Sequence, residues 1–429
     1  MRFFYECNKM ATDVDVQYFS HLNGLTLGNN WGDMIRLLDA CLVNGLPLTS
    51  ITSASIDAQG DIHLTTYAAH NSMLFQIVEL SGFAPAELNG KYRIKGIPSS
   101  KQLILKAAHV GKSINTTGSA KLASLGYDII FRDNNDVKRV YRAKNPRAEH
   151  PFIRVDESLT SLDGTTGVYA STYAKYAMVG LLENMTHIDD HENPDILQLP
   201  FDPADPAKNW RIIGTGQNVV RGWSCWYWNV GTLYNDNTSN SLTPPNVNVP
   251  WSICGDQNAF YFAPSTHNQV QKQLWGCGIY NDPQQLNAPW FLFAALPTQK
   301  ANENFQFGYT LGGSVLMLGQ GGHQFITTST DIRDLHHKTA TPILPDYSSG
   351  MTTIYEGSEI PALEIPFFDS DKKLRGSLKH VFYMGKKINS INATPEISTN
   401  NELFLKENLR QSVNDQTGSA GVYFFLGVM

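Results

Sequence analysis

Tryptophan is concentrated in one part of this chain, and this concentration limits the folds that the chain can adopt. Seven of the eight tryptophans lie within residues 210–290, and Trp223, Trp226 and Trp228 occur together in residues 222–228. The two-residue spacing of Trp226 and Trp228 places both rings on one face of a β-strand. Because an aromatic ring of this kind buries ~150–250 Å², the stretch predicts a β-rich region built around several large rings.

Three roles are open for these rings. Core packing is the simplest interpretation. Tryptophan and tyrosine are also enriched where subunits meet, and aromatic faces can stack on the sugar rings of a glycan. We take Trp223, Trp226, Trp228 and Trp251 as candidate binding residues for an interface or a glycan.

The charge pattern excludes several classes of protein. Charged residues make up 17% of the chain, below the usual ~25%. A net charge of -6 without a basic stripe argues against nucleic-acid binding. No window reaches the ~18 apolar residues that a membrane-spanning helix needs, so no membrane insertion is expected. Glu6 interrupts the apolar start of the chain, which predicts no signal peptide and synthesis in a cytoplasm.

No residue pattern predicts an enzyme, a cofactor or a metal site. The sharpest metal candidate is the pair His187 and His191, but Ile188 stands where the zinc-protease pattern requires Glu. We therefore expect an exposed acidic loop there. The five cysteines are odd in number and form no C-x-x-C pair, which indicates free thiols. No G-x-S-x-G motif supports nucleophilic hydrolysis.

One amphipathic helix is predicted over residues 31–44. Apolar residues recur there at helical spacing, with Leu38 on the buried face. Asn30 is the expected N-cap, with Asp33 completing a variant of the capping box. Gly45 follows the last periodic residue and gives a stop signal.

Alternating residues and regular turn signals predict that the chain is mainly β and multi-domain. Residues 1–47 form an arm and the helix, which packs on a small β-barrel or sandwich at residues 48–130. Residues 131–429 form a larger, aromatic-rich β domain. The strands expected in the small domain include residues 61–67, 91–97 and 102–107, and the three bases of residues 91–97 share one strand face.

Four stretches of the larger region have a distinct composition. Residues 132–147 are dense in charge and are expected to be an exposed strand or connector. Residues 173–184 have weak helical periodicity and could form a short helix. Residues 235–250 are rich in Asn and Pro and predict an exposed loop tip. Residues 422–428 predict a buried strand that needs a partner.

Segments in the first two thirds of the chain resemble a family of tailed-bacteriophage virion proteins. Its members open with a short helix reading LLDACLVNG, as residues 37–45 do here. A β-domain segment, two strands and an aromatic stretch of the family then resemble later parts of this chain in the same order. The resemblance covers roughly residues 25–300, and its segments are residues 32–45, 83–94, 138–142, 152–157 and 249–262.

The resemblance implies a role in the virion and no chemistry, because the family is described only as structural or tail protein. It implies a tail or baseplate subunit that contacts other virion proteins. It also favours a symmetric homo-oligomer, a trimer or hexamer, since closed symmetry is the rule for such assemblies. The alternatives are a capsid-decorating protein, a receptor-binding adhesin that grips a host-surface glycan, and, more distantly, a glycan-cleaving enzyme.

Overall fold

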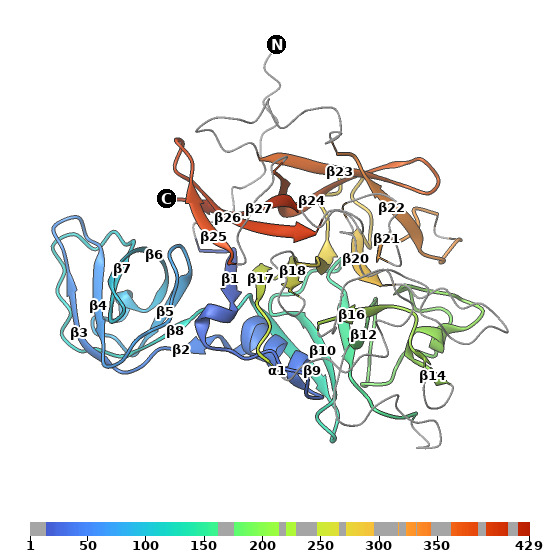
Figure 1. Ribbon diagram of the computed structural model, residues 1–429, viewed down its shortest axis with the longest axis horizontal. Coiled ribbons are helices and arrows are strands. Elements are labelled where there is room, and N and C mark those ends of the chain that lie inside the picture. The colour runs from blue at the N-terminus through green and yellow to red at the C-terminus, as the bar shows by residue number, and fades with distance from the viewer. Residues whose placement is uncertain are drawn as a thin grey trace, which may run out of the picture.

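The computed structural model describes residues 14–161, 176–213, 220–228, 247–265, 272–295, 316, 323–331, 333–344, 362–384, 392–410 and 419–429. Over these residues the chain is mainly β, as predicted. An N-terminal helix, a small sheet of seven strands and a large antiparallel sheet of eighteen strands make up the described architecture (Figure 1).

The small sheet forms a lobe on one side of the molecule (Figure 1). Its strands curl into an open half-barrel with β2 and β3 at the two edges. The predicted strands at 61–67, 91–97 and 102–107 are confirmed as β4, β6 and β7. In chain order the strands are β2 (Leu46–Pro47), β3 (Ile51–Ile56), β4 (Ile62–Thr66), β5 (Ile77–Ser81), β6 (Gly90–Ser99), β7 (Gln102–Leu105) and β8 (Ser119–Leu122).

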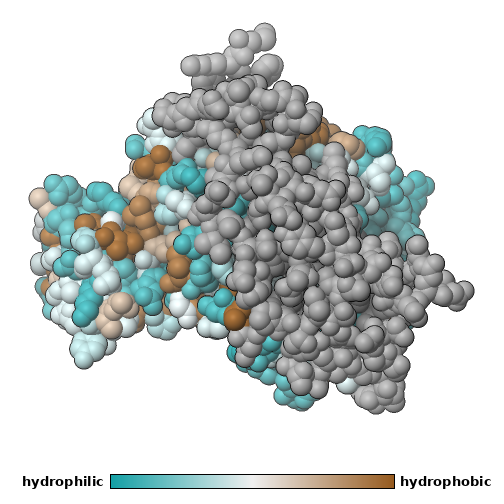
Figure 2. Space-filling model, viewed as in Figure 1, coloured by the Kyte–Doolittle hydropathy of each residue, from teal (hydrophilic) through white to brown (hydrophobic). Residues whose placement is uncertain are grey.

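The visible surface of this lobe mixes hydrophobic and hydrophilic residues (Figure 2). The most exposed large hydrophobic residues on it are Tyr67 and Val110. They lie at opposite ends of β4, because Tyr67 follows the strand whereas the backbone of Val110 packs against Gly60, just before it. Gly60 has a φ of +88° and no room for a Cβ, so a larger residue would displace this loop. The two exposed side chains therefore do not form one apolar patch.

The predicted helix is confirmed, with a different start. It comprises α1 (Asp33–Leu38) and a π-helical continuation, η2 (Asp39–Asn44). The N-cap is Gly32 rather than Asn30, and no side chain of this segment caps the helix. Half of the expected capping box exists, since the Asn30 N–H donates to the Asp33 carboxylate at 2.9 Å. The missing half is supplied from another part of the chain, as described below.

The helix lies at the junction of the two sheets. Its last turn meets the small sheet, where Lys121 donates to the carbonyl of Asn44. The π-helical turn contacts β9 of the large sheet, and the N–H of Leu125 donates to Cys41 O at 3.0 Å. One apolar cluster runs from the small sheet through the helix into the tryptophan-bearing strands. The helix thus joins both sheets instead of resting on the small one alone.

The two faces of the helix should respond differently to mutation. Leu38 is fully buried in the shared cluster, so Leu38→Ala should cost ~2–5 kcal/mol, the usual range for a core leucine. The side chain of Arg36 is 57% exposed, and its replacement by Ala should cost under ~0.5 kcal/mol. Urea unfolding of both variants measures this difference, and equal losses of stability would contradict the amphipathic arrangement.

The large sheet begins with a strand from the N-terminal arm and ends with the C-terminal strand. β1 pairs with β17, and the chain passes from the small to the large sheet between β8 and β9. The strands are β1 (Gln17–Ser20), β9 (Tyr127–Arg132), β10 (Lys138–Ala143), β11 (Phe152–Asp156), β12 (Tyr176–Leu182), β13 (Gln198–Leu199), β16 (Cys225–Tyr227), β17 (Trp251–Gly255), β18 (Ala259–Pro264), β19 (Trp275–Ile279), β20 (Trp290–Ala295), β21 (His323–Thr327), β22 (Lys338–Pro342), β23 (Leu363–Asp369), β24 (Leu374–Tyr383), β25 (Thr394–Ile397), β26 (Glu402–Arg410) and β27 (Ser419–Val428).

Short elements complete the described chain. They are the two-stranded sheet of β14 (Ile212–Ile213) and β15 (Val220–Arg221), and the 3-10 helices η1 (His21–Asn23), η3 (Ala86–Leu88) and η4 (Pro206–Trp210). No helix within the described ranges is both long and apolar enough to cross a membrane.

One prediction for the larger region was wrong, and a second was wrong in part. The described part of residues 173–184 is the strand β12, buried along its whole length, so its continuous apolar run reflects burial on both faces. The charged stretch 132–147 contains β10, which is almost entirely buried: Lys138 and Arg139 form ion pairs, and Arg142 stacks on Phe152. Residues 134–136 and 144–147, on either side of this strand, are exposed as expected. The predicted C-terminal strand is confirmed as β27, which pairs with β26 and β24. Of the expected loop tip, residues 235–246 lie outside the described residues.

Two buried polar contacts attach the C-terminal strands to the rest of the protein. Arg93 of β6 is 1% exposed, although its neighbours in the sequence suggest an outward basic face. Its guanidinium donates to the carbonyls of Phe75 and Leu426, both at 2.6 Å. Lys272 and Glu407 form an ion pair of 2.9 Å in which both side chains are 0% exposed. These contacts link β27 to the small sheet and β26 to the region of β18.

Candidate functional site

Three of the four candidate tryptophans lie in the core. Trp226, Trp228 and Trp251 are 0%, 1% and 0% exposed. Trp226 Nε1 donates to the carbonyl of Phe293 at 2.7 Å, and Trp228 Nε1 donates to that of Gly28 at 3.1 Å. Rings without exposed surface cannot touch a glycan or a second subunit in this conformation. For these three residues the structure favours core packing among the three roles.

Trp223 is the exception, because it is only half-buried. The Lys208 ammonium lies 4.1 Å from the centre of its ring, and the ring of His337 packs edge-on at 4.7 Å. Local partners therefore occupy both the cation-binding face and an edge of this ring. The four candidates do not come together as one exposed aromatic site.

A buried carboxylate caps the N-terminus of the helix. Glu157 follows β11 and is 0% exposed. Its carboxylate accepts hydrogen bonds from the N–H groups of Gly32 and, at 2.8 Å, of Ile35. These groups have no partner within the helix, and the helix dipole favours a negative charge at this end. Farther along, Asp39 accepts from Tyr141 Oη at 2.7 Å, so the helix is also joined to β10.

The pKa of Glu157 should make stability depend on pH. Burial raises this pKa to about 7, although the two N–H donors and Arg221 favour the charged form. Between pH ~4.5 and ~7 the Glu157 carboxyl is protonated in the folded protein and ionised in the unfolded chain. The free energy of unfolding therefore decreases as the pH rises from ~4.5 to ~7, by on the order of 3 kcal/mol. Urea unfolding at pH 5 and pH 7.5 measures it. Glu157→Gln should remove most of this fall, and an unchanged pH dependence in the variant would contradict the assignment.

The histidine pair does not form a metal site in the described structure. His187 is exposed, whereas His191 is buried against the ring of Trp210. Burial lowers the pKa of His191 to about 3, so its imidazole is neutral. The carboxylate between them, Asp189, pairs with Lys138 and Arg154, each at 2.7 Å. Among the described residues, no group of three or more metal-binding side chains is present anywhere.

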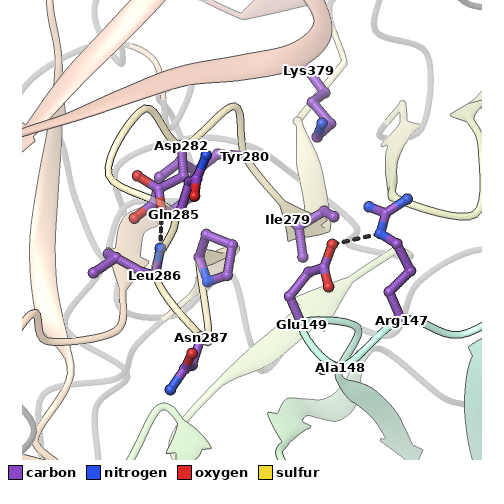
Figure 3. A pocket seen from close by; sticks show the side chains of 11 residues that line it. Arg147, Ala148, Glu149, Ile279, Tyr280, Asp282, Gln285, Leu286, Asn287 and Lys379 are labelled. Carbon is purple, nitrogen blue, oxygen red and sulfur yellow. Dashed lines mark hydrogen bonds and ion pairs between the residues drawn. The ribbon is translucent and has the colours of Figure 1, made fainter. Parts of the chain in front are cut away.

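A pocket of about 400 Å³ lies on the described surface. Three segments build it: the loop between β10 and β11, the loop between β19 and β20, and β24. Arg147 and Glu149 form an ion pair on one wall (Figure 3). Asp282 stands across from them and holds its own loop by accepting from the N–H groups of Gln284 and Leu286. Lys379 reaches from β24 toward Ile279 and the ion pair (Figure 3).

The walls of this pocket are anchored in the core. Trp290 Nε1 donates to the carbonyl of Glu149 at 2.7 Å. Arg147 donates to the Asn258 side chain at 3.0 Å, and the ring of His150 contacts the same oxygen at 3.1 Å. These contacts hold the β10–β11 loop against the β17–β18 turn, so one wall of the pocket is preorganised.

The two cations that line the pocket, Arg147 and Lys379, differ in whether they form an ion pair. Arg147 is neutralised by Glu149, whereas Lys379 Nζ makes no hydrogen bond or ion pair within the described part of the chain. Burial lowers the pKa of Lys379, and Asp256 and Glu149 oppose this shift only at longer range. Asp256 is itself occupied by His380, whose Nε2 lies 3.1 Å from Oδ1. Burial would raise the pKa of Asp256, but His380 and Asn258 hold it well below its usual value.

Sequence reasoning did not single out these pocket residues. They come from three segments that lie 90 residues or more apart in the sequence, and none belongs to a recognised motif. The structure also reveals a backbone feature that no sequence pattern marks: His380, next to Lys379, has a φ of +62° within β24. The arrangement can bind a small polar ligand. No nucleophile–base pair is apparent among the groups that face the pocket.

The comparisons with known proteins establish no family. No protein-family model matches the chain, and no curated protein matches it. A solved structure of a phage protein, the Phage phi92 endosialidase, is similar over 89% of this chain and 52% of that chain, at 10% identity and a TM-score of 0.15. The chain thus spans about half the length of that protein. Similarity at this level does not establish a common fold or a common activity.

Proposed function

We propose that this chain is a structural subunit of a tailed-bacteriophage virion, placed in the tail or baseplate. The proposal rests on the resemblance of five segments to such proteins and on where those segments lie in the structure. All five contribute residues to the same apolar cluster, for example Leu38, Leu88, Tyr141, Val155 and Phe260. A resemblance carried by segments that meet in one core points to a shared framework rather than to a shared active site.

The contacts between these segments support a framework role. The capping of the helix by Glu157 joins residues 32–45 to residues 152–157. The hydrogen bond from Tyr141 to Asp39 joins the same helix to β10. Each contact joins residues more than a hundred positions apart in the sequence; the Glu157 contacts are buried and the Tyr141 contact is partly buried. These contacts connect the segments that carry the resemblance into one framework.

Purified particles provide the test. Mass spectrometry should find the chain in gradient-purified virions at a fixed copy number relative to the main capsid protein, and antibody labelling should mark the tail. Labelling of the head would instead support the capsid-decorating alternative. Presence of the chain in infected lysate but not in particles would contradict a virion role altogether.

The same proposal includes a symmetric homo-oligomer, a trimer or a hexamer, in contact with other virion proteins. Closed point-group symmetry is the rule for soluble oligomers. Analytical ultracentrifugation of the purified chain, and the symmetry of its density in the particle, measure this directly. An adhesin role stays as the second candidate, because the pocket beside Lys379 offers a ligand site separate from the core.

A further inference from the structure

The pocket between the β10–β11 loop, the β19–β20 loop and β24 contains a cation without a partner. Lys379 Nζ lines it, is half-buried, and makes no hydrogen bond or ion pair within the described residues, whereas the side-chain amides of Gln285 and Asn287, which also line it, are exposed to solvent. Several other buried or half-buried charges of the protein have close partners, as Lys138 has in Asp189. A partly desolvated cation without a partner is costly unless something else binds it.

The backbone of β24 is shaped to present this cation. The pairing of β24 with β23 shifts register between Glu364 and Pro366, opposite residues 377–382. Within this irregular stretch His380 adopts a φ of +62°, which is uncommon for a residue with a side chain. Such a bulge redirects side chains and is typical of strands next to binding sites. Here His380 turns to Asp256, while Lys379 faces the pocket.

The charges around the pocket restrict the ligand. Two cations, Arg147 and Lys379, and two carboxylates, Glu149 and Asp282, line it, and their formal charges cancel. The two carboxylates repel an anion in proportion to its charge, so a doubly charged anion such as phosphate is disfavoured more than a singly charged one. A ligand with one negative charge can pair with Lys379. Hydroxyl groups on the same ligand can donate to the carboxylates and exchange hydrogen bonds with the amides.

We propose that this pocket binds a sugar that carries a single carboxylate, with Lys379 pairing with the carboxylate and with Glu149, Gln285 and Asn287 contacting the hydroxyl groups. A volume of about 400 Å³ lies at the small end of ligand pockets and suits one or two sugar rings. Ile279, Leu286 and Pro289 supply apolar surface for the ring carbons. The site does not involve the candidate tryptophans, and it does not depend on the virion role.

Paired sugars test the proposal on the full-length protein. Glucuronate and galacturonate differ from glucose and galactose by the carboxylate, so ligand-observed NMR titrations with the four sugars isolate the contribution of Lys379. We expect the uronates to bind at least tenfold more tightly than their neutral counterparts. Lys379→Met should abolish this preference, whereas Lys379→Arg should keep most of it. Lys91→Met, which removes an exposed lysine of β6, is the matched control and should change nothing.

Three outcomes would overturn the proposal. Equal binding of uronates and neutral sugars would show that the pocket does not recognise the carboxylate. An unchanged preference for uronates in Lys379→Met would show that Lys379 does not bind it. Acetate that binds as tightly as glucuronate would show that the hydroxyl groups contribute nothing and that the ligand is not a sugar. Thermal unfolding of each variant confirms that a loss of binding does not reflect a loss of fold.

Discussion

Lys272→Met should destabilise the protein by ~3–5 kcal/mol, because it leaves the buried carboxylate of Glu407 without its counter-charge. Adding Glu407→Gln should restore at least half of that loss. The glutamine removes the unpaired charge. Its oxygen can accept from the Asn408 N–H, which now donates to one oxygen of Glu407, and its NH2 group can donate to Ser252 Oγ, which now donates to the other. Urea unfolding of the wild type, both single variants and the double variant gives the coupling energy of the pair.

An exposed ion pair provides the control for this cycle. Lys112 and Glu87 lie 2.6 Å apart, with side chains 41% and 52% exposed. Lys112→Met removes the same charge but should cost under ~1 kcal/mol, since solvent screens exposed pairs. If Lys272→Met is no more harmful than Lys112→Met, the buried pair does not hold β26 to the region of β18, and the C-terminal strands are attached mainly by their apolar cluster.

Trp226→Ala should also cost ~3–5 kcal/mol, the usual range for a fully buried aromatic residue. The change would leave a cavity beside Phe260, whose ring packs edge-on against Trp226, and would free the carbonyl of Phe293. Trp223→Ala, in the same segment but half-buried, should cost under ~2 kcal/mol. Chemical unfolding and the yield of assembled particles measure both effects.

This comparison also separates a core role from a receptor role for the tryptophans. A core ring affects folding first, so Trp226→Ala should lower stability and incorporation into particles together. If particles with Trp226→Ala form at normal yield and fail to attach to cells, the ring contacts a receptor in a conformation that differs from this structure. The adhesin alternative would then replace the assignment of this residue to the core.

The contacts at the ends of the chain have one consequence for how the protein behaves as a unit. Arg93 attaches the small sheet to β27, and β1 of the arm pairs with β17. The N-terminal strand thus contacts the middle of the chain, and the C-terminal strand contacts the small sheet near its beginning. Loss of a C-terminal strand should therefore weaken regions far from it in sequence, as expected when buried contacts join distant segments.

The sequence by itself determined the class of the fold and its order along the chain. Periodicity is a local property, so the helix at residues 33–44 and the strands β4, β6 and β7 could be read from spacing alone. The tryptophan-rich stretch also indicated burial, because large rings leave water wherever a core can take them. These predictions depend on neighbours within a few residues, which the sequence displays directly.

Tertiary structure decided the partners of the charged groups. The alternation of residues suggested an outward-facing Arg93, and the charge density suggested that β10 is exposed. Both are buried: Arg93 donates hydrogen bonds to distant carbonyls, and carboxylates pair with charged residues of β10. The cap of the helix comes from Glu157, far along the chain, in place of the local Asn30. The pocket around Lys379 depends on three separate segments and a bulge. Burial of a charge is favourable only when a partner is present, and only the folded chain brings such partners together.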